Sequence, residues 1–166
     1  MAIIRNQNIN ANLNSTDIEL ALAQHLNYRQ NLIVPNVFWG LGFRYELDLL
    51  ILYPSGWANE IEIKISKADL KADLKKKHNH NSDRIQKLYF AVPNYLKAEA
   101  LELIPKKAGL FIVDQIDGFY KVYIEKTPTI NKLARKLNEA EINKLYHLMS
   151  MRIWSLKEHI RNHRKI

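Results

Sequence analysis

The 166-residue sequence contains no cysteine and only five glycines and five prolines. The absence of cysteine excludes disulfide frameworks, thiolate zinc sites and thiol nucleophiles, so any metal must be bound by oxygen or imidazole ligands. Together with a hydrophobic content of 47%, the low glycine and proline content is typical of one folded domain rather than of a disordered or fibrous chain.

Long apolar segments are also missing. The run LDLLILY is far shorter than a membrane span. The N-terminal stretch MAIIRNQNINANLNS lacks the basic region and the long apolar region of a secretory signal. We therefore expect a cytoplasmic protein with no membrane partner.

The net charge of +8 is unevenly distributed along the chain. Residues 1–60 contain 3 Lys and Arg against 5 Asp and Glu, whereas residues 61–166 contain 22 against 12. A basic surface around an acidic patch suits an enzyme that cuts nucleic acid, because cations hold phosphates and carboxylates hold the metal. Composition alone equally fits an ordinary soluble basic protein.

The spacing of apolar residues predicts an α/β fold. A first helix is expected over residues 15–30, with Thr16 and Glu19 as its capping box. The strand-type and helix-type segments then follow in the order α-β-β-β-α-β-α-β-β, which predicts a mixed sheet with helices on both faces. The expected strands lie near residues 32–38, 45–53, 58–65, 88–93, 109–114 and 119–126, and the later helices begin at Ser66 and cover residues 95–104.

The composition changes after residue 127. Residues 128–166 consist largely of helix formers and contain no glycine, and residues 126–166 carry ten Lys and Arg against three acids. We predict a core over residues 1–127 and a basic extension of one or two helices over residues 128–166, packed on the same domain.

The predicted second and third strands form a hairpin that carries the acidic residues. Asp48 lies on the second strand, while Glu60, Glu62 and Lys64 alternate with isoleucines in the stretch EIEIKI and share one face. Carboxylates that converge on adjacent strands repel one another unless a cation lies between them, and oxygen-only ligands favour Mg²⁺ or Mn²⁺. The Lys64 ammonium could then orient the attacking water. The same alternation is also typical of an ordinary solvated strand face.

This arrangement resembles the PD-(D/E)XK nuclease superfamily, whose restriction-endonuclease-like core has the order α-β-β-β-α-β. The resemblance is strongest to the MmcB-like bacterial DNA-repair proteins, in EIEIKISKADLKADLKK, LYFAVP and GLFIVD, over about residues 15–127. It implies catalytic positions for Asp48, Glu62 and Lys64, with Asp48 and Glu62 as metal ligands, and it places Glu19 at the helix acid of many members. Leu47 replaces the motif proline, and Glu46 is an additional acid without an assigned role.

Several neighbouring residues have two interpretations. Lys67, Lys71 and Lys75 recur every four residues after the hairpin, and they either follow a phosphate backbone or form a solvated helix face. Glu19 is either a capping residue or part of the metal site. Asp73 is expected on a solvated face beside Lys76 and Lys77, and His78 and His80 are expected in a flexible polar loop rather than in a zinc site.

The function predicted from these observations is Mg²⁺- or Mn²⁺-dependent hydrolysis of phosphodiesters in DNA, in repair or recombination. The alternative is an inactive DNA-binding repair adaptor with the same fold, and RNA remains a third possible target. A homodimer formed through the C-terminal helices would let two sites address two strands.

Overall fold

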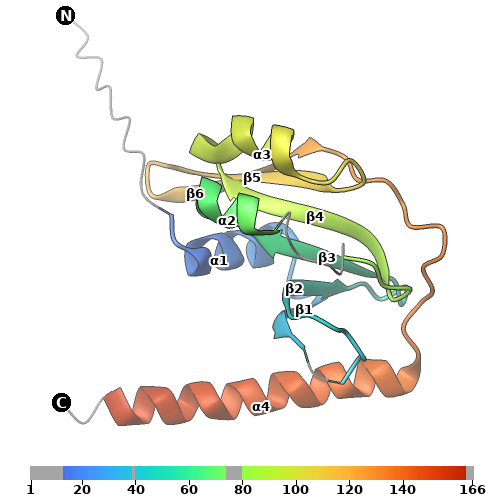
Figure 1. The fold of residues 1–166 in the computed structure, drawn as a ribbon. Helices are drawn as coiled ribbons and strands as arrows, with labels where there is room; N and C mark the ends of the chain where they lie inside the picture. The colour runs from blue at the N-terminus through green and yellow to red at the C-terminus, as the bar shows by residue number, and fades with distance from the viewer. Residues whose placement is uncertain (1–12, 39, 74–79, 164–166) are drawn as a thin grey trace, which may run out of the picture.

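The computed structural model describes residues 13–38, 40–73 and 80–163, which form one six-stranded mixed sheet with helices on both faces (Figure 1). The strands lie in the sheet in their order along the chain. β1 to β3 are antiparallel, β3 to β5 are parallel, and β6 returns antiparallel to β5. Their bounds are Leu32–Val37 for β1, Leu47–Leu52 for β2, Ala58–Ile63 for β3, Ile85–Pro93 for β4, Gly109–Ile116 for β5 and Phe119–Lys126 for β6. The predicted element order is confirmed.

The helices divide between the two faces. α1 (Ser15–His25) covers one face, where it packs against Ile61 and Ile63 of β3. The other face is covered by α2 (Lys67–Asp73), α3 (Lys97–Leu103) and the first turns of α4 (Glu139–His163), with the short 3₁₀ helix η1 (Asn94–Leu96) leading into α3. Because side chains alternate along a strand, Glu60 and Glu62 point toward this second group of helices.

The start of α1 differs from the prediction. Asn14 caps the helix: its side chain accepts the N–H of Asp17 at 3.0 Å, and the Asp17 carboxylate accepts the N–H of Asn14 at 2.9 Å. The expected capping box of Thr16 and Glu19 is therefore wrong, because an asparagine two residues earlier takes the N-cap position. This leaves the Glu19 carboxylate available for another role.

The turns that flank β3 fix the position of the hairpin. Gly56, with φ of 87°, closes the turn between β2 and β3 and donates its N–H to the Tyr53 carbonyl at 2.9 Å. Only glycine adopts this left-handed conformation without strain. After β3, the Ser66 hydroxyl accepts the N–H of Asp69 at 3.1 Å and begins α2 as predicted.

The C-terminal part contains one long helix among the described residues. Residues 127–138 first pass along the ends of the strands without forming a helix, and α4 then runs for 25 residues beside β1, with its C-terminal half extending away from the sheet (Figure 1). Within the described residues, none of the helices is both long and apolar enough to pass through a lipid bilayer.

Candidate active site

Asp48, Glu62 and Lys64 meet at one point on the face that α2 covers. The Lys64 ammonium lies 2.7 Å from Glu62 Oε2 and 3.5 Å from Asp48 Oδ2. Asp48 Oδ2 also accepts the backbone N–H of Ile63 at 2.8 Å, which fixes that carboxylate against the adjacent strand. The structure therefore brings together the three residues that the sequence assigned to the catalytic motif.

The Lys64 side chain is buried and remains charged. Burial alone would lower the pKa of its ammonium, but the carboxylates of Glu62, Asp48 and Asp73 outweigh burial, so the pKa lies above the usual lysine value. A lysine with a raised pKa cannot accept a proton near neutral pH. Its chemistry here is that of a fixed positive charge and hydrogen-bond donor.

Two more residues complete the cluster, and both differ from the prediction. Asp73 is 6% exposed, and its Oδ1 lies 3.4 Å from the Lys64 ammonium, so the expected solvated face is wrong. His80 is 5% exposed, and its ring nitrogens lie 2.6 Å from Glu60 Oε1 and 2.9 Å from Asp73 Oδ2, so it does not belong to a flexible polar loop. Lys76, Lys77 and His78 lie outside the described residues.

The resulting chain of contacts runs from Tyr45, which donates its hydroxyl to Glu60 Oε2 at 3.0 Å, through His80 and Asp73 to Lys64. We call this set the site network. It consists of Tyr45, Asp48, Glu60, Glu62, Lys64, Asp73 and His80.

Burial and neighbouring side chains shift the pKa values of His80 and Glu60 in the site network. Burial opposes protonation of His80, but hydrogen bonds with Asp73 and Glu60 and the charges of Glu60 and Glu62 raise its pKa to about 9. Burial also raises the pKa of Glu60, and contacts with His80 and Tyr45 oppose this effect. At neutral pH His80 is therefore an imidazolium that lies between two acids.

The site network contains more acids than cations. Four carboxylates face the two cations Lys64 and His80 among the described residues. Clustered carboxylate oxygens can hold a divalent cation, and such donors suit Mg²⁺ or Mn²⁺.

Two ligand sets could hold this cation. Ligand atoms of Glu60, Glu62 and His80 all lie within 4.8 Å of one another. A metal at this set would require His80 to release its proton, which the hydrogen bonds of the ring with Asp73 and Glu60 oppose. Asp48 and Glu62 fit better, because the Asp48 side chain is 33% exposed and connects the buried acids with solvent.

Glu19 lies in α1, on the opposite face of the sheet, and its charge interacts with that of Asp48. The pKa of Glu19 is raised by burial and then by the charge of Asp48, whereas Arg152 of α4 opposes the shift. The Arg152 guanidinium also donates a hydrogen bond to the Asn36 carbonyl just inside the end of β1. Glu19 therefore belongs to the electrostatic surroundings of Asp48.

The predicted row of lysines follows α2. Lys67 and Lys71 are exposed, and Lys67 forms an ion pair with Glu99 of α3 at 3.6 Å. Lys75 lies outside the described residues. Because Asp73 of the same helix contacts Lys64, the two described lysines lie on the element that covers the site.

Comparison with known proteins places this chain in a family. A family model described as DNA repair protein MmcB-like matches residues 14–159. The chain belongs to the MmcB-like family. The match includes every described residue of the site network, and it continues beyond the expected residue 127 into α4. Membership indicates a role in DNA repair.

The fold also has a counterpart among solved structures. SPO1766, a protein of unknown function from Silicibacter pomeroyi, is similar with a TM-score of 0.59 and 23% sequence identity, over 89% of this MmcB-like chain and 90% of that chain. No curated protein matches.

Sequence reasoning missed the parts of the site that depend on burial. Glu60 shares a face with Glu62, so its position was visible, but not its contact with His80. Nothing in the stretch KKKHNHNSD distinguishes a buried histidine from a solvated one. His80 enters the site because the chain folds back over β3 before it begins β4.

Proposed function

We propose that this protein is a metal-dependent DNA endonuclease of the PD-(D/E)XK superfamily that hydrolyses phosphodiester bonds in DNA repair or recombination. The observation that carries the proposal is the Lys64 ammonium, which contacts the carboxylates of both Asp48 and Glu62 on adjacent strands. The order α1, β1, β2, β3, α2, β4 supports a restriction-endonuclease-like core, because it matches the α-β-β-β-α-β order.

Each side chain has a defined part in this proposal. Asp48 and Glu62 would hold Mg²⁺ or Mn²⁺, which when bound lowers the pKa of water and offsets charge on the phosphate. Lys64 orients the attacking water and stabilises the negative charge that develops on the phosphate oxygens. Glu19 adds an acid beside Asp48. Asp73, held in turn by His80, positions the Lys64 ammonium.

The surface charge favours a nucleic acid as the substrate, and the DNA-repair family favours DNA. Residues 61–166 carry 22 Lys and Arg against 12 acids, and Lys67 and Lys71 lie on the helix that covers the site. Backbone contacts of this kind hold nucleic acid without reading its sequence, so binding should weaken steeply with salt. We propose selection of a DNA structure rather than of a sequence, and competition between DNA and RNA of one sequence tests the preference.

The decisive experiment compares cleavage of branched and single-stranded DNA in Mn²⁺ by the wild type and by Glu62→Gln. We expect the cleavage rate to fall by at least about 100-fold, because the variant loses a metal ligand and the partner of Lys64. Lys64→Met should lose a similar amount, whereas the exposed Glu102→Gln serves as a matched control with unchanged rate.

Circular dichroism shows whether each variant is folded. Equal cleavage by wild type and Glu62→Gln would remove the nuclease assignment. DNA binding without any cleavage by the wild type would favour the repair adaptor.

We further propose that α4 pairs two copies of the chain. Tyr146, Met149, Ile153, Leu156 and Ile160 alternate at spacings of three and four residues, which is the pattern of a coiled-coil seam. Ile153, Leu156 and Ile160 lie in the half of α4 that extends beyond the core, and all three are exposed. Sedimentation equilibrium should give a dimer that Ile153→Glu converts to a monomer, and a monomeric wild type would refute the pairing.

A further inference from the structure

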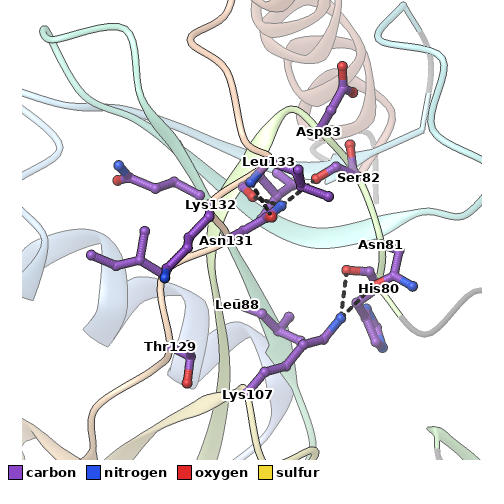
Figure 2. A pocket seen from close by; sticks show the side chains of 13 residues that line it. His80, Asn81, Ser82, Asp83, Leu88, Lys107, Thr129, Asn131, Lys132 and Leu133 are labelled. Carbon is purple, nitrogen blue, oxygen red and sulfur yellow. Dashed lines mark hydrogen bonds between the residues drawn. The ribbon is translucent and has the colours of Figure 1, made fainter.

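A cavity of about 620 Å³ lies next to the site network, on the far side of His80 (Figure 2). Its walls come from the segment that leads into β4, from β4 itself, from Lys107 before β5, and from residues 129–133 after β6. Cavities of this size are typical of small-molecule sites. Nothing in the proposed cleavage mechanism uses this space.

The walls of the cavity combine an apolar part with a cationic part. Ile85 and Leu88, both buried, form an apolar surface together with Ile130. Lys107 and Lys132 supply two ammonium groups. A flat apolar group attached to an anion matches both parts, since the ring replaces water on the aliphatic surface and the lysines hold the anion.

Hydrogen bonds hold these walls in place. The Asn131 side chain donates to the carbonyls of Ser82 and Ile85, each at 3.0 Å. The backbone N–H of Thr129 donates to the Lys107 carbonyl at 2.9 Å. The segment after β6 is therefore fixed against the start of β4, so a ligand would meet a preformed site.

The cavity is also connected to the candidate active site. Lys107 donates from Nζ to Asn81 Oδ1 at 2.7 Å and to the His80 carbonyl at 3.4 Å, as Figure 2 shows. The His80 ring in turn contacts Glu60 and Asp73, and Asp73 contacts Lys64. An anion bound by the Lys107 ammonium would therefore compete with the contact between Lys107 and the His80 carbonyl, and His80 links Glu60 to Asp73 in the site network.

We propose that this cavity binds one nucleotide, with the base against Ile85, Leu88 and Ile130 and the phosphate held by the lysines of its wall, Lys107 and Lys132. The proposal rests on the proposed DNA substrate only for the source of the nucleotide, which is either an unpaired nucleotide of a DNA strand or a free mononucleotide. It does not require cleavage.

Calorimetric titration of the full chain with deoxyadenosine monophosphate tests the proposal, with deoxyribose 5-phosphate as the probe that lacks a base. We expect the complete nucleotide to bind roughly tenfold more tightly than the sugar phosphate, because only the base covers the apolar wall. Lys132→Glu and Ile130→Asn, both at exposed positions, should each weaken nucleotide binding by roughly tenfold. Absence of binding, equal affinity for both probes, or variants that bind like the wild type would overturn the proposal.

A second titration with single-stranded DNA identifies the source. If the same variants also weaken binding of a normal strand, but not of a strand carrying abasic residues, the nucleotide comes from the strand. If only the mononucleotide responds, the ligand is a free nucleotide. Asp48→Asn should bind the mononucleotide normally, so loss of cleavage in that variant does not affect the nucleotide proposal. If the wild type cleaves DNA in a Glu62-dependent way but binds no nucleotide, the nucleotide proposal is overturned and the proposed nuclease function is not.

Discussion

Two charged clusters meet the short segment that leads into β4. His80 belongs to the site network, whereas Asp83 and Arg84 belong to a second cluster with Arg135 and Glu141, which we call the arginine cluster. The arginine cluster has two acids and two arginines, and Glu141 accepts hydrogen bonds of 2.7 to 2.8 Å from both guanidinium groups. The site network has four carboxylates and two cations.

The two clusters differ in their ratio of acids to cations, and we interpret the arginine cluster as a structural anchor and the site network as the functional site. The arginine cluster is neutral as it stands, and it fixes the start of α4 to the segment before β4. Within the described residues, the site network is largely buried and its carboxylates outnumber its two cations, and such a set of oxygen ligands fits a divalent cation. Two clusters of charged residues can therefore have different roles, one structural and one functional, and the ratio of acidic to basic side chains distinguishes them.

The largest expected effect is on folding stability. His80→Ala removes the cation between Glu60 and Asp73, so we expect the free energy of unfolding in urea to fall by about 3–5 kcal/mol. The matched change in the arginine cluster, Arg84→Ala, leaves Glu141 paired with Arg135 and should cost only about 1 kcal/mol. Equal losses of unfolding free energy in the two variants would show that the site network and the arginine cluster contribute to stability in the same way.

A divalent cation should stabilise only the unbalanced cluster. At 100 times its dissociation constant, Mn²⁺ should raise the free energy of unfolding of the wild type by about 2.7 kcal/mol, since it binds the folded acids alone. Thermal unfolding with and without Mn²⁺ measures this rise. Glu62→Gln should abolish the rise and Glu141→Gln should retain it, whereas an identical rise in all three proteins would place the ion elsewhere.

The two clusters should lose stability at opposite ends of the pH range. The pKa of His80 is raised from 6.5 to about 9, so its contribution is complete below pH 6.5 and is lost as the pH rises through 9. Hydrogen bonds from Arg135 lower the pKa of Glu141 from 4.5 to about 2, so its contribution is complete above pH 4.5 and is lost as the pH falls through 2.

Urea unfolding across this range should show a change of about 3 kcal/mol on the alkaline side. His80→Ala should remove the alkaline change and Glu141→Gln the acid change. If His80→Ala removed the acid change in stability, or Glu141→Gln removed the alkaline change, the assignment of these two pKa shifts would be contradicted.

The smallest effect concerns the start of α4. The backbone N–H of Asn138 and that of Glu141 each donate to the side chain of the other residue at 2.9 Å, as in a capping box, and Asn138→Ala removes one of these two hydrogen bonds. We therefore expect a loss of about 1 kcal/mol at pH 7 by thermal unfolding, with the exposed Glu139→Gln as the control. A loss as large as that of His80→Ala would mean that the arginine cluster carries more of the fold than its balance suggests.

The sequence predicted the features that depend on local periodicity. Alternation in EIEIKI and the turn at Gly56 were sufficient to place Asp48, Glu62 and Lys64 on one face of a hairpin, because a strand has a fixed period of two. The same pattern could not show whether the polar face is wet or buried. That depends on α2 and on the segment around His80, whose positions are set by packing across the sheet rather than by neighbouring residues.

The prediction of helix boundaries from the sequence was limited where neighbouring residues are equally suited to the same position. Both Asn14 and Thr16 are good N-cap residues, and the choice between them depends on where Ile18 and Leu22 must pack. Composition predicts one or two helices over residues 128–166, because it does not show that residues 127–138 instead form hydrogen bonds along the ends of the strands before α4 begins.

The strand order of the sheet has a consequence for biosynthesis. Spatial neighbours are sequence neighbours throughout the sheet, and the whole site network lies between Tyr45 and His80. Contacts between residues that are close in the sequence cost the least loop-closure entropy and therefore form fastest. The acids and their two cations can therefore assemble on the nascent chain before the cavity wall at residues 129–133 has been translated.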